Sequence, residues 1–355
     1  MPTFTASELQ AFVTDLFRAA GVPEEEARIV ADALVTANLV GQDSHGVIRI
    51  PQYLQLLRRG QIRPGAPLEV VREAETTAVL DGHWGFGQVQ ARRATQMALA
   101  KARTYGLGAV GLHHCNHVGR LADYVLLAVE QGCVGLCMVN NHGAGRNTAP
   151  FGGTQRRLST NPIAFAAPTA QGEPLLVDIT TSVTAEGKIR VRRNRGQRVP
   201  EGWLLDGYGR PTTDPQALYR EPRGALLPLG GEVGYKGFGL SLMVEVLAGA
   251  LSGAGCSREE ATVVGNGFFL LALDISRFAP VDEVARQLSE LIAYVKSSPT
   301  QPGFTEILVP GEPEARTAAR RRAEGIPIDE ETWRQVLEAA QPLLPLPSLE
   351  VRGGK

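Results

Sequence analysis

The chain has 355 residues, with 36 lysines and arginines against 37 aspartates and glutamates, and its formal net charge at pH 7 is -1. Such a chain has no long-range field to attract nucleic acid or an anionic membrane. No apolar run is long enough to span a membrane, the N-terminus lacks a signal-peptide core, and four cysteines are too few for a disulfide framework. We therefore expect a cytoplasmic protein of two or three lobes.

The N-terminal segment is predicted to be helical. Thr5 and Glu8 form a capping box ahead of a run with helical apolar spacing. A second helix is expected at 23–39 and a third at about 47–59. The stretch QDSHGV (42–47) is then a junction between two helices, and its polar residues include potential helix caps.

From about residue 76 the pattern alternates between strands and helices, which is typical of an α/β layer. The expected strands are 77–82, 107–112, 133–139, 174–180 and 268–275. The expected helices between them are 88–105, 121–130 and 236–251.

The C-terminal part returns to helices, at 281–297, 313–323 and 329–340, before a Pro-rich tail (342–355) that we expect to be irregular. Since the two ends are alike in character, we predict that 1–75 and 281–355 form one discontinuous helical domain. Residues 76–280 then form the central α/β domain that binds cofactor and substrate.

A dinucleotide fingerprint is missing. No G-x-G-x-x-G motif lies between a strand and a helix, no G-x-x-x-x-G-K-[ST] motif occurs, and GHWGFG (82–87) has the wrong spacing. Any nucleotide must therefore bind without a standard Rossmann turn.

Four of the six histidines lie between residues 113 and 142, namely His113, His114, His117 and His142. Imidazole titrates near neutral pH, so one of them is a candidate proton donor or acceptor. Histidine and cysteine are also zinc ligands, but the chain has neither H-E-x-x-H nor paired C-x-x-C motifs. We predict no metal, and a metal-dependent hydrolase or lyase stays as an alternative from another class.

His45 and Arg49 lie one helical turn apart in the junction. A guanidinium holds a carboxylate through two hydrogen bonds, so Arg49 can orient a 2-oxo or 2-hydroxy acid toward an imidazole. The Gly-rich turn at 228–237 leads into an apolar helix, where Lys236 is a candidate partner for a cofactor phosphate. A buried Glu245 within that helix would need a partner.

The motifs together resemble the type 2 malate/L-lactate dehydrogenase family, which also includes sulfolactate, ureidoglycolate and diketogulonate oxidoreductases. The matching stretches are DSHGVIRIPQYL (43–54), NHVGRLADY (116–124), TNPIAFAAP (160–168), VDITTSVTAEGK (177–188), PLGGEVGYKGFGLSLMVEVLAGALSG (228–253) and VPGEPE (309–314). The resemblance implies a mixed α/β, non-Rossmann fold with a helical domain built from both chain ends. It also implies a homodimer that binds NAD or NADP near the subunit interface, and we slightly prefer NAD.

The resemblance also assigns roles to residues. The catalytic candidates are His45 and His117. The substrate-binding candidates are Ser44, Arg49, Tyr53, Asn140 and Thr160. The cofactor-binding candidates are Val177, Asp178, Ile179, Thr180, Lys188, Tyr235, Lys236, Gly311, Glu312 and Pro313. The arginines at 190–195 are either surface residues or partners of a 2′-phosphate.

We therefore expect an NAD(P)-dependent oxidoreductase that interconverts a 2-hydroxy acid of the malate or lactate type and its 2-oxo acid, with a histidine as acid and base. Within the same family, the alternatives are a reductase of cyclic 2-imino acids or of sulfopyruvate, diketogulonate or ureidoglycolate-type substrates. A non-catalytic ligand-binding protein is a further alternative.

Overall fold

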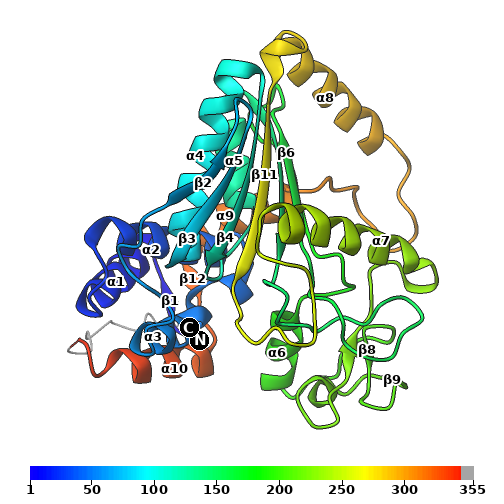
Figure 1. Cartoon of the computed structure of the whole chain (residues 1–355). Helices are drawn as coiled ribbons and strands as arrows, with labels where there is room; N and C mark the ends of the chain where they lie inside the picture. Colours follow the sequence, from blue (N-terminus) through cyan, green and yellow to red (C-terminus); the bar gives the residue numbers. More distant parts are fainter. Residues whose placement is uncertain (345–355) are drawn as a thin grey trace.

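A seven-stranded mixed sheet forms the centre of the molecule, and the computed structural model describes residues 1–344 (Figure 1). In spatial order the strands are β2 (Glu69–Glu73), β3 (Thr77–Gly85), β4 (Leu107–Cys115), β11 (Asn266–Asp274), β5 (Cys133–Asn140), β6 (Ile163–Ala167) and β7 (Leu175–Ile179). The helices are α1 (Ala6–Ala19), α2 (Glu24–Leu39), α3 (Ile50–Arg58), α4 (Gly87–Tyr105), α5 (Ala122–Val129), α6 (Glu186–Asn194), α7 (Tyr235–Val244), α8 (Val281–Lys296), α9 (Glu312–Glu324) and α10 (Glu330–Ala340).

The sheet is mixed because β3 and β4 pair in parallel while the other neighbours pair antiparallel. Helices α4 and α5 pack on it, and the small residues of α4 permit a close approach. A Cβ on Gly108 of β4 would lie 2.0 Å from the carbonyl oxygen of Ala98, so this contact requires glycine. The mixed α/β class is confirmed, as are the expected strands of the central part and its helices at 88–105 and 121–130.

The two ends of the chain meet. Short strands β1 (Thr3–Phe4) and β12 (Ile326–Pro327) pair antiparallel, and one buried apolar cluster contains residues of α1, α2, α3, α9 and α10. The capping box of Thr5 and Glu8 is confirmed, and the side chain of Asp329 caps α10 by accepting from the amides of Glu331 and Thr332. Each such cap stabilises its helix by about 1 kcal/mol. This shared core supports a helical unit built from both ends.

Helix α8 lies elsewhere, beside β6 and the far end of β11 in Figure 1. Its Ser289 hydroxyl accepts a hydrogen bond from the Ala170 amide at 2.9 Å, and no residue of α8 belongs to the buried cluster of the chain ends. The domain boundaries at 75 and 281 therefore stay a prediction. Of the tail predicted to be irregular, 345–355 lies outside the described residues.

Three local features differ from the sequence-based expectation. The junction before α3 consists of two 3-10 turns, Asp43–His45 and Val47–Arg49. The expected helix at 236–251 is α7 followed by a π-helical segment, Glu245–Leu251. Strand β6 was not predicted, nor was a small sheet of β8 (Leu204–Leu205), β9 (Pro211–Thr212) and β10 (Ala225–Leu226). Within residues 1–344 no helix is long and apolar enough to cross a membrane.

Candidate active site

The helix junction at 43–49 is held in place by the side chain of Asn38. Its Oδ1 accepts a hydrogen bond from the Val47 amide at 2.8 Å, and its Nδ2 donates one to Asp43 at 2.8 Å. The close packing leaves no room at Gly46, where a Cβ would lie 2.1 Å from Asn38 Oδ1. The buried amide thus fixes the backbone that presents the following arginine and the preceding histidine.

Two histidines meet at this junction. The rings of His45 and His117 stack with their centroids 5.6 Å apart and an interplanar angle of 14°. Nδ1 of His117 lies 2.7 Å from the hydroxyl of Tyr53, which in turn accepts a hydrogen bond from Nε2 of Gln88 at 2.8 Å. His45 has a weaker local partner, the hydroxyl of Ser44 at 3.1 Å. His117 is therefore the more firmly oriented of the two imidazoles.

Both imidazoles are held in the neutral form. Burial lowers the pKa of His45 to about 3, and the positive charge of Arg49 contributes to the shift, with smaller contributions from Arg120 and Lys188. Burial also lowers the pKa of His117 well below its usual value, again with a contribution from Arg49. At neutral pH each ring therefore has one free lone pair and accepts a proton readily only when a negative charge arrives nearby.

The phenol of Tyr53 is neutral as well, because burial raises its pKa to about 12. A neutral hydroxyl both donates and accepts. With Gln88 as donor to the phenol oxygen, the Tyr53 proton points to Nδ1 of His117, and the ring proton of the neutral imidazole lies on Nε2. Oε1 of Gln88 is buried and has no partner among the described residues, so it is available to accept if the chain of hydrogen bonds reverses.

Arg49 is anchored but not neutralised. Its Nε donates to the carbonyl of Ser44 at 2.7 Å and its Nη1 to the side chain of Gln52 at 3.0 Å. Within residues 1–344 it forms no ion pair, and burial lowers its pKa. An uncompensated, partly buried guanidinium is suited to bind an anion, and a carboxylate matches its geometry.

Helix α6 packs against the helix junction at 43–49. Gly187 packs so tightly that its Cβ would lie 2.6 Å from Cβ of Ser44, which explains the glycine of the E-G-K motif. Arg190 is paired with Glu186 at 2.9 Å, and Glu186 also accepts a hydrogen bond from Tyr219 at 2.6 Å. Lys188 is exposed and forms no ion pair within the described residues.

Apart from Lys188, which lies on α6, the expected cofactor-binding residues fall into two groups. On β7, Asp178 accepts a hydrogen bond from the Ala122 amide at the start of α5, and burial raises its pKa to about 6. The turn before α9 lies beside this strand, since the Leu176 amide donates to the carbonyl of Pro310 at 3.2 Å. Glu312 there is already engaged, as it pairs with Lys296. Val177, Ile179, Thr180, Gly311 and Pro313 lie in the same two segments.

The second group lies at the start of α7. Tyr235 and Lys236 are exposed, and the helix has no side-chain cap at Gly234. Its first N–H groups and the ammonium of Lys236 are therefore available to an anion.

Two expected substrate-binding residues form hydrogen bonds with structural partners and, among the described residues, none with His45 or His117. The amide of Asn140 donates to Gly255 and to the buried Glu245, which thus finds the partners that its burial requires. Thr160 accepts a hydrogen bond from the Thr181 amide through its carbonyl oxygen. Their assignment to the substrate stays a prediction.

The sequence-based prediction missed Gln88 and Arg120. Gln88 lies at the start of α4, where the other buried positions are mostly small and apolar. An amide among such positions is the sequence signal that could have identified it as a site residue. Arg120 is buried and paired with Asp123 at 2.7 Å, so its charge acts on His45 without being free for a ligand.

Comparison with known proteins gives one consistent family. A family model described as malate/L-lactate dehydrogenase matches residues 4–337. A malate dehydrogenase of Pyrococcus abyssi is 40% identical over 342 residues, which cover 94% of this chain and 93% of that protein. An L-sulfolactate dehydrogenase of Methanothermobacter thermautotrophicus is 38% identical over 338 residues, 93% of this chain and 94% of that one. The solved structure of a delta1-piperideine-2-carboxylate reductase from Pseudomonas syringae pvar. tomato matches with a TM-score of 0.83 at 31% identity, covering 96% of this chain and 100% of that chain.

Proposed function

The chain belongs to the malate/L-lactate dehydrogenase family and is an oxidoreductase of hydroxy acids, and on this premise we propose that it interconverts a 2-hydroxy acid and its 2-oxo acid with NAD or NADP. The observation that carries the proposal is that Arg49, which forms no ion pair within the described residues, lies close enough to the oriented His117 for its charge to lower the pKa of that imidazole. A 2-oxo acid needs these two groups, one for its carboxylate and one for the proton of its C2 oxygen.

The residues present fit a dinucleotide without a Rossmann turn. The exposed, uncapped start of α7 with Lys236 suits a phosphate, and β7 with the turn at 309–313 offers a second segment close to Arg120 and α5. When bound, NAD(P)H supplies the hydride that reduces C2. The strand neighbours in the sheet are mostly antiparallel, which agrees with a non-Rossmann mode of binding. We favour NAD over NADP.

We assign the proton transfer to His117 and a positioning role to His45. In oxidation of the alcohol, His117 takes the hydroxyl proton at Nε2, which requires its other proton to lie on Nδ1. This Nδ1–H donates a hydrogen bond to the oxygen of Tyr53, and the Tyr53 hydroxyl donates to Oε1 of Gln88 after the Gln88 amide rotates to exchange its Nε2 for the unpartnered Oε1. In reduction the same atoms act in reverse, with His117 protonated while the anionic substrate is bound.

The positive charges near His45 favour substrates with two acidic groups. Arg49 and Lys188 both influence the pKa of His45, and neither forms an ion pair within the described residues. Arg49 takes the carboxylate next to C2, and Lys188 is placed to attract a second acidic group. Malate and sulfolactate carry such a group and lactate does not. The malate and sulfolactate dehydrogenases among the relatives agree with this choice.

A reductase of cyclic 2-imino acids is the second candidate, favoured by the similarity to the piperideine-carboxylate reductase. Such a substrate has one carboxylate and no second acidic group, so it leaves Lys188 without a partner. This difference separates the two candidates.

The exposed face of α7 supports a homodimer, as the family resemblance implies. Leu242, Met243 and Val246 are 39% to 53% exposed on α7 and the π-helical segment, next to the proposed phosphate site. We propose that a second copy covers this face in the cytoplasm. Light scattering on the purified chain measures the oligomeric state directly.

The test of the proposed function is the loss of NADH or NADPH absorbance with oxaloacetate, sulfopyruvate, pyruvate, diketogulonate and a cyclic 2-imino acid. We expect oxaloacetate or sulfopyruvate to give the highest kcat/KM. A higher value for the imino acid replaces the first candidate with the second, and no turnover with any substrate overturns both.

A further inference from the structure

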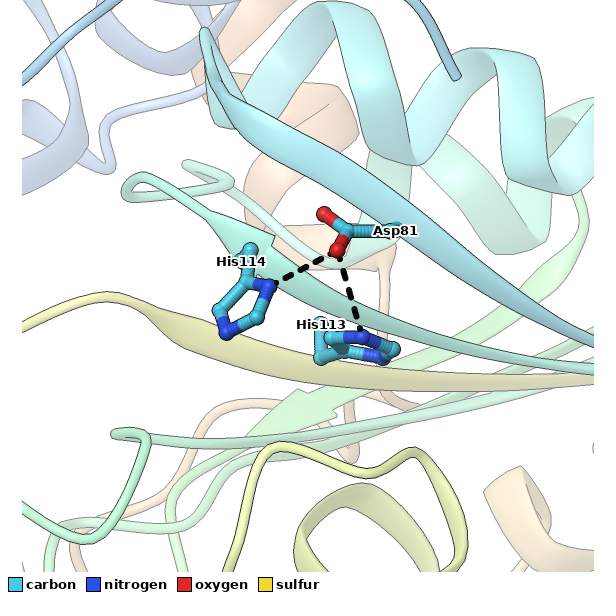
Figure 2. A group of neighbouring side chains, drawn as sticks. All are labelled: Asp81, His113 and His114. Atoms are coloured by element: carbon cyan, nitrogen blue, oxygen red, sulfur yellow. Dashed lines mark hydrogen bonds and ion pairs between the residues drawn. The ribbon is translucent and has the colours of Figure 1, made fainter. Parts of the chain in front are cut away.

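We propose that Asp81, His113 and His114 bind a divalent cation of the zinc class at the ends of β3 and β4. Figure 2 shows the two imidazoles directed at one carboxylate oxygen. Oδ2 of Asp81 lies 2.9 Å from Nδ1 of His114 and 3.6 Å from Nε2 of His113, and the three ligand atoms lie within 4.8 Å of one another. Ligands of a tetrahedral zinc ion are about 3.3 Å apart, so small side-chain shifts suffice.

The backbone is shaped to bring these side chains together. Asp81 and His113 are register partners in the parallel pair β3–β4, so their side chains share one face of the sheet. In a regular strand His114 would point to the opposite face. Its φ of 47° is in the left-handed region, and its ring nevertheless reaches the same carboxylate.

Backbone strain is concentrated around this cluster. Within residues 1–344, five residues other than glycine have a positive φ, and four of them are His83, Trp84, His114 and His142. The β3–β4 register is also irregular just beyond Asp81. Such conformations are strained for residues other than glycine, and strain of this kind gathers at ligand sites.

The orientation of the His113 ring supplies an independent argument. Its Nδ1 lies 2.7 Å from the carbonyl oxygen of Ser252, which only accepts hydrogen bonds, so Nδ1 is the donor of this contact. Nε2, the other ring nitrogen, then faces Oδ2 of Asp81 at 3.6 Å, beyond ordinary hydrogen-bond distance, so Nε2 is the atom directed at a shared cation. A ring N–H bonded to a backbone carbonyl is also the usual support for a metal-bound histidine.

The surroundings define the class of cation and the open coordination position. Two imidazoles and one carboxylate favour zinc, cobalt or nickel over calcium or magnesium. The side chain of His114 is 39% exposed, so water can complete the coordination. Nε2 of His142 accepts a hydrogen bond from the His114 amide at 3.1 Å, so this third histidine supports the cluster without serving as a ligand.

The site does not depend on the proposed dehydrogenase activity, and binding is its readout. The full chain, freed of metal with a chelator and carrying Cys256→Ser to remove its exposed thiol, is titrated with Zn²⁺ and Co²⁺. We expect one equivalent to bind, with the visible absorption of tetrahedral cobalt, and binding to weaken as the pH falls because protons compete for the imidazoles.

Two variants test the proposed ligands, and a third variant serves as a matched control. Asp81→Asn and His114→Asn should each weaken binding by at least about 100-fold. His83→Asn is the control, because His83 also has a positive φ, which asparagine tolerates, but its ring binds Glu69 outside the cluster. Zinc should raise the Tm of the parent and the control but not of the ligand variants.

Absence of stoichiometric binding by the parent overturns the proposal. So does an equal affinity of parent, Asp81→Asn and His114→Asn, or an equal loss in the His83→Asn control. If dehydrogenase activity fails while zinc binds as described, the proposed function falls and the metal site stands.

Discussion

The hydroxyl of Tyr53 lies 2.7 Å from Nδ1 of His117, although 64 positions separate the two residues in sequence. The phenol also contacts Gln88, so a buried chain of three polar groups ends at the imidazole. Either direction of hydrogen bonding satisfies the phenol, and each direction selects one tautomer of the histidine. The chain thus holds the ring in one orientation while allowing its proton to change place.

Replacement of Tyr53 by phenylalanine should lower kcat by about 10- to 100-fold with little change in KM, because the ring of His117 loses the partner that orients it. Phenylalanine keeps the aromatic contacts with Phe17 and Phe86. The matched control is Tyr124→Phe, which removes another buried phenol whose hydroxyl donates to the Val118 carbonyl. Both variants should lose stability by about 1 kcal/mol. An unchanged kcat for Tyr53→Phe in steady-state assays excludes the phenol from the proton pathway.

Removal of the Arg49 side chain should raise KM for the 2-oxo acid strongly. The lost contact corresponds to about 2–4 kcal/mol in kcat/KM, since Arg49→Ala leaves the substrate carboxylate without its charged partner. Arg58→Ala is the control, because this arginine is exposed and, among the residues that the structure describes, donates only to the Ala339 carbonyl. If kcat/KM of Arg49→Ala equals that of the control, Arg49 does not bind the substrate.

Local signals in the sequence predicted most of the elements. The Thr5 cap and the apolar spacing that follows it specify α1 from neighbouring residues alone, and the same holds for Asp329 and α10. The order of the sheet could not be read in this way. Strand β11 inserts between β4 and β5 through pairings with residues more than 120 positions away, and no short-range pattern encodes such a partner.

The sequence predicted which residues are candidates for the site, but not which of them lie next to one another. His45 and His117 were both candidates, and only the three-dimensional arrangement shows that Tyr53 and Gln88 orient one of them. The π-helical segment after α7 could not be predicted from the local sequence either. It places Glu245 where Asn140, Asn161 and Ser257 bind its carboxylate, and these partners are distant in sequence or outside the helix.

The stability of the protein should fall in acid because of the buried imidazoles. The pKa of His45 is about 3 in the folded chain, against 6.5 for an unperturbed histidine. Between these values the unfolded chain binds more protons than the folded chain, so the free energy of unfolding increases with pH. The stability is therefore complete above about pH 6.5 and decreases as the pH falls toward 3.

Urea denaturation of His45→Gln at pH 7, 6 and 5 tests this dependence. In the parent the free energy of unfolding should rise with pH. In His45→Gln this rise should be smaller by up to about 1.4 kcal/mol per pH unit, because glutamine does not titrate. His83→Gln is the control, since this imidazole is 35% exposed. A slope that is the same in both variants and the parent contradicts the proposed neutral state of His45.

We predict that Lys188 makes the site prefer a substrate with a second acidic group. Lys188 is exposed on α6, its charge lowers the pKa of His45, and it has no carboxylate partner within residues 1–344. Lys188→Met should therefore lower kcat/KM by about tenfold or more for oxaloacetate or sulfopyruvate, and much less for pyruvate. Lys188→Arg keeps the charge and should retain the preference for the two-acid substrates. An equal loss for pyruvate and oxaloacetate contradicts this role, and a raised KM for NADH alone assigns Lys188 to the cofactor instead.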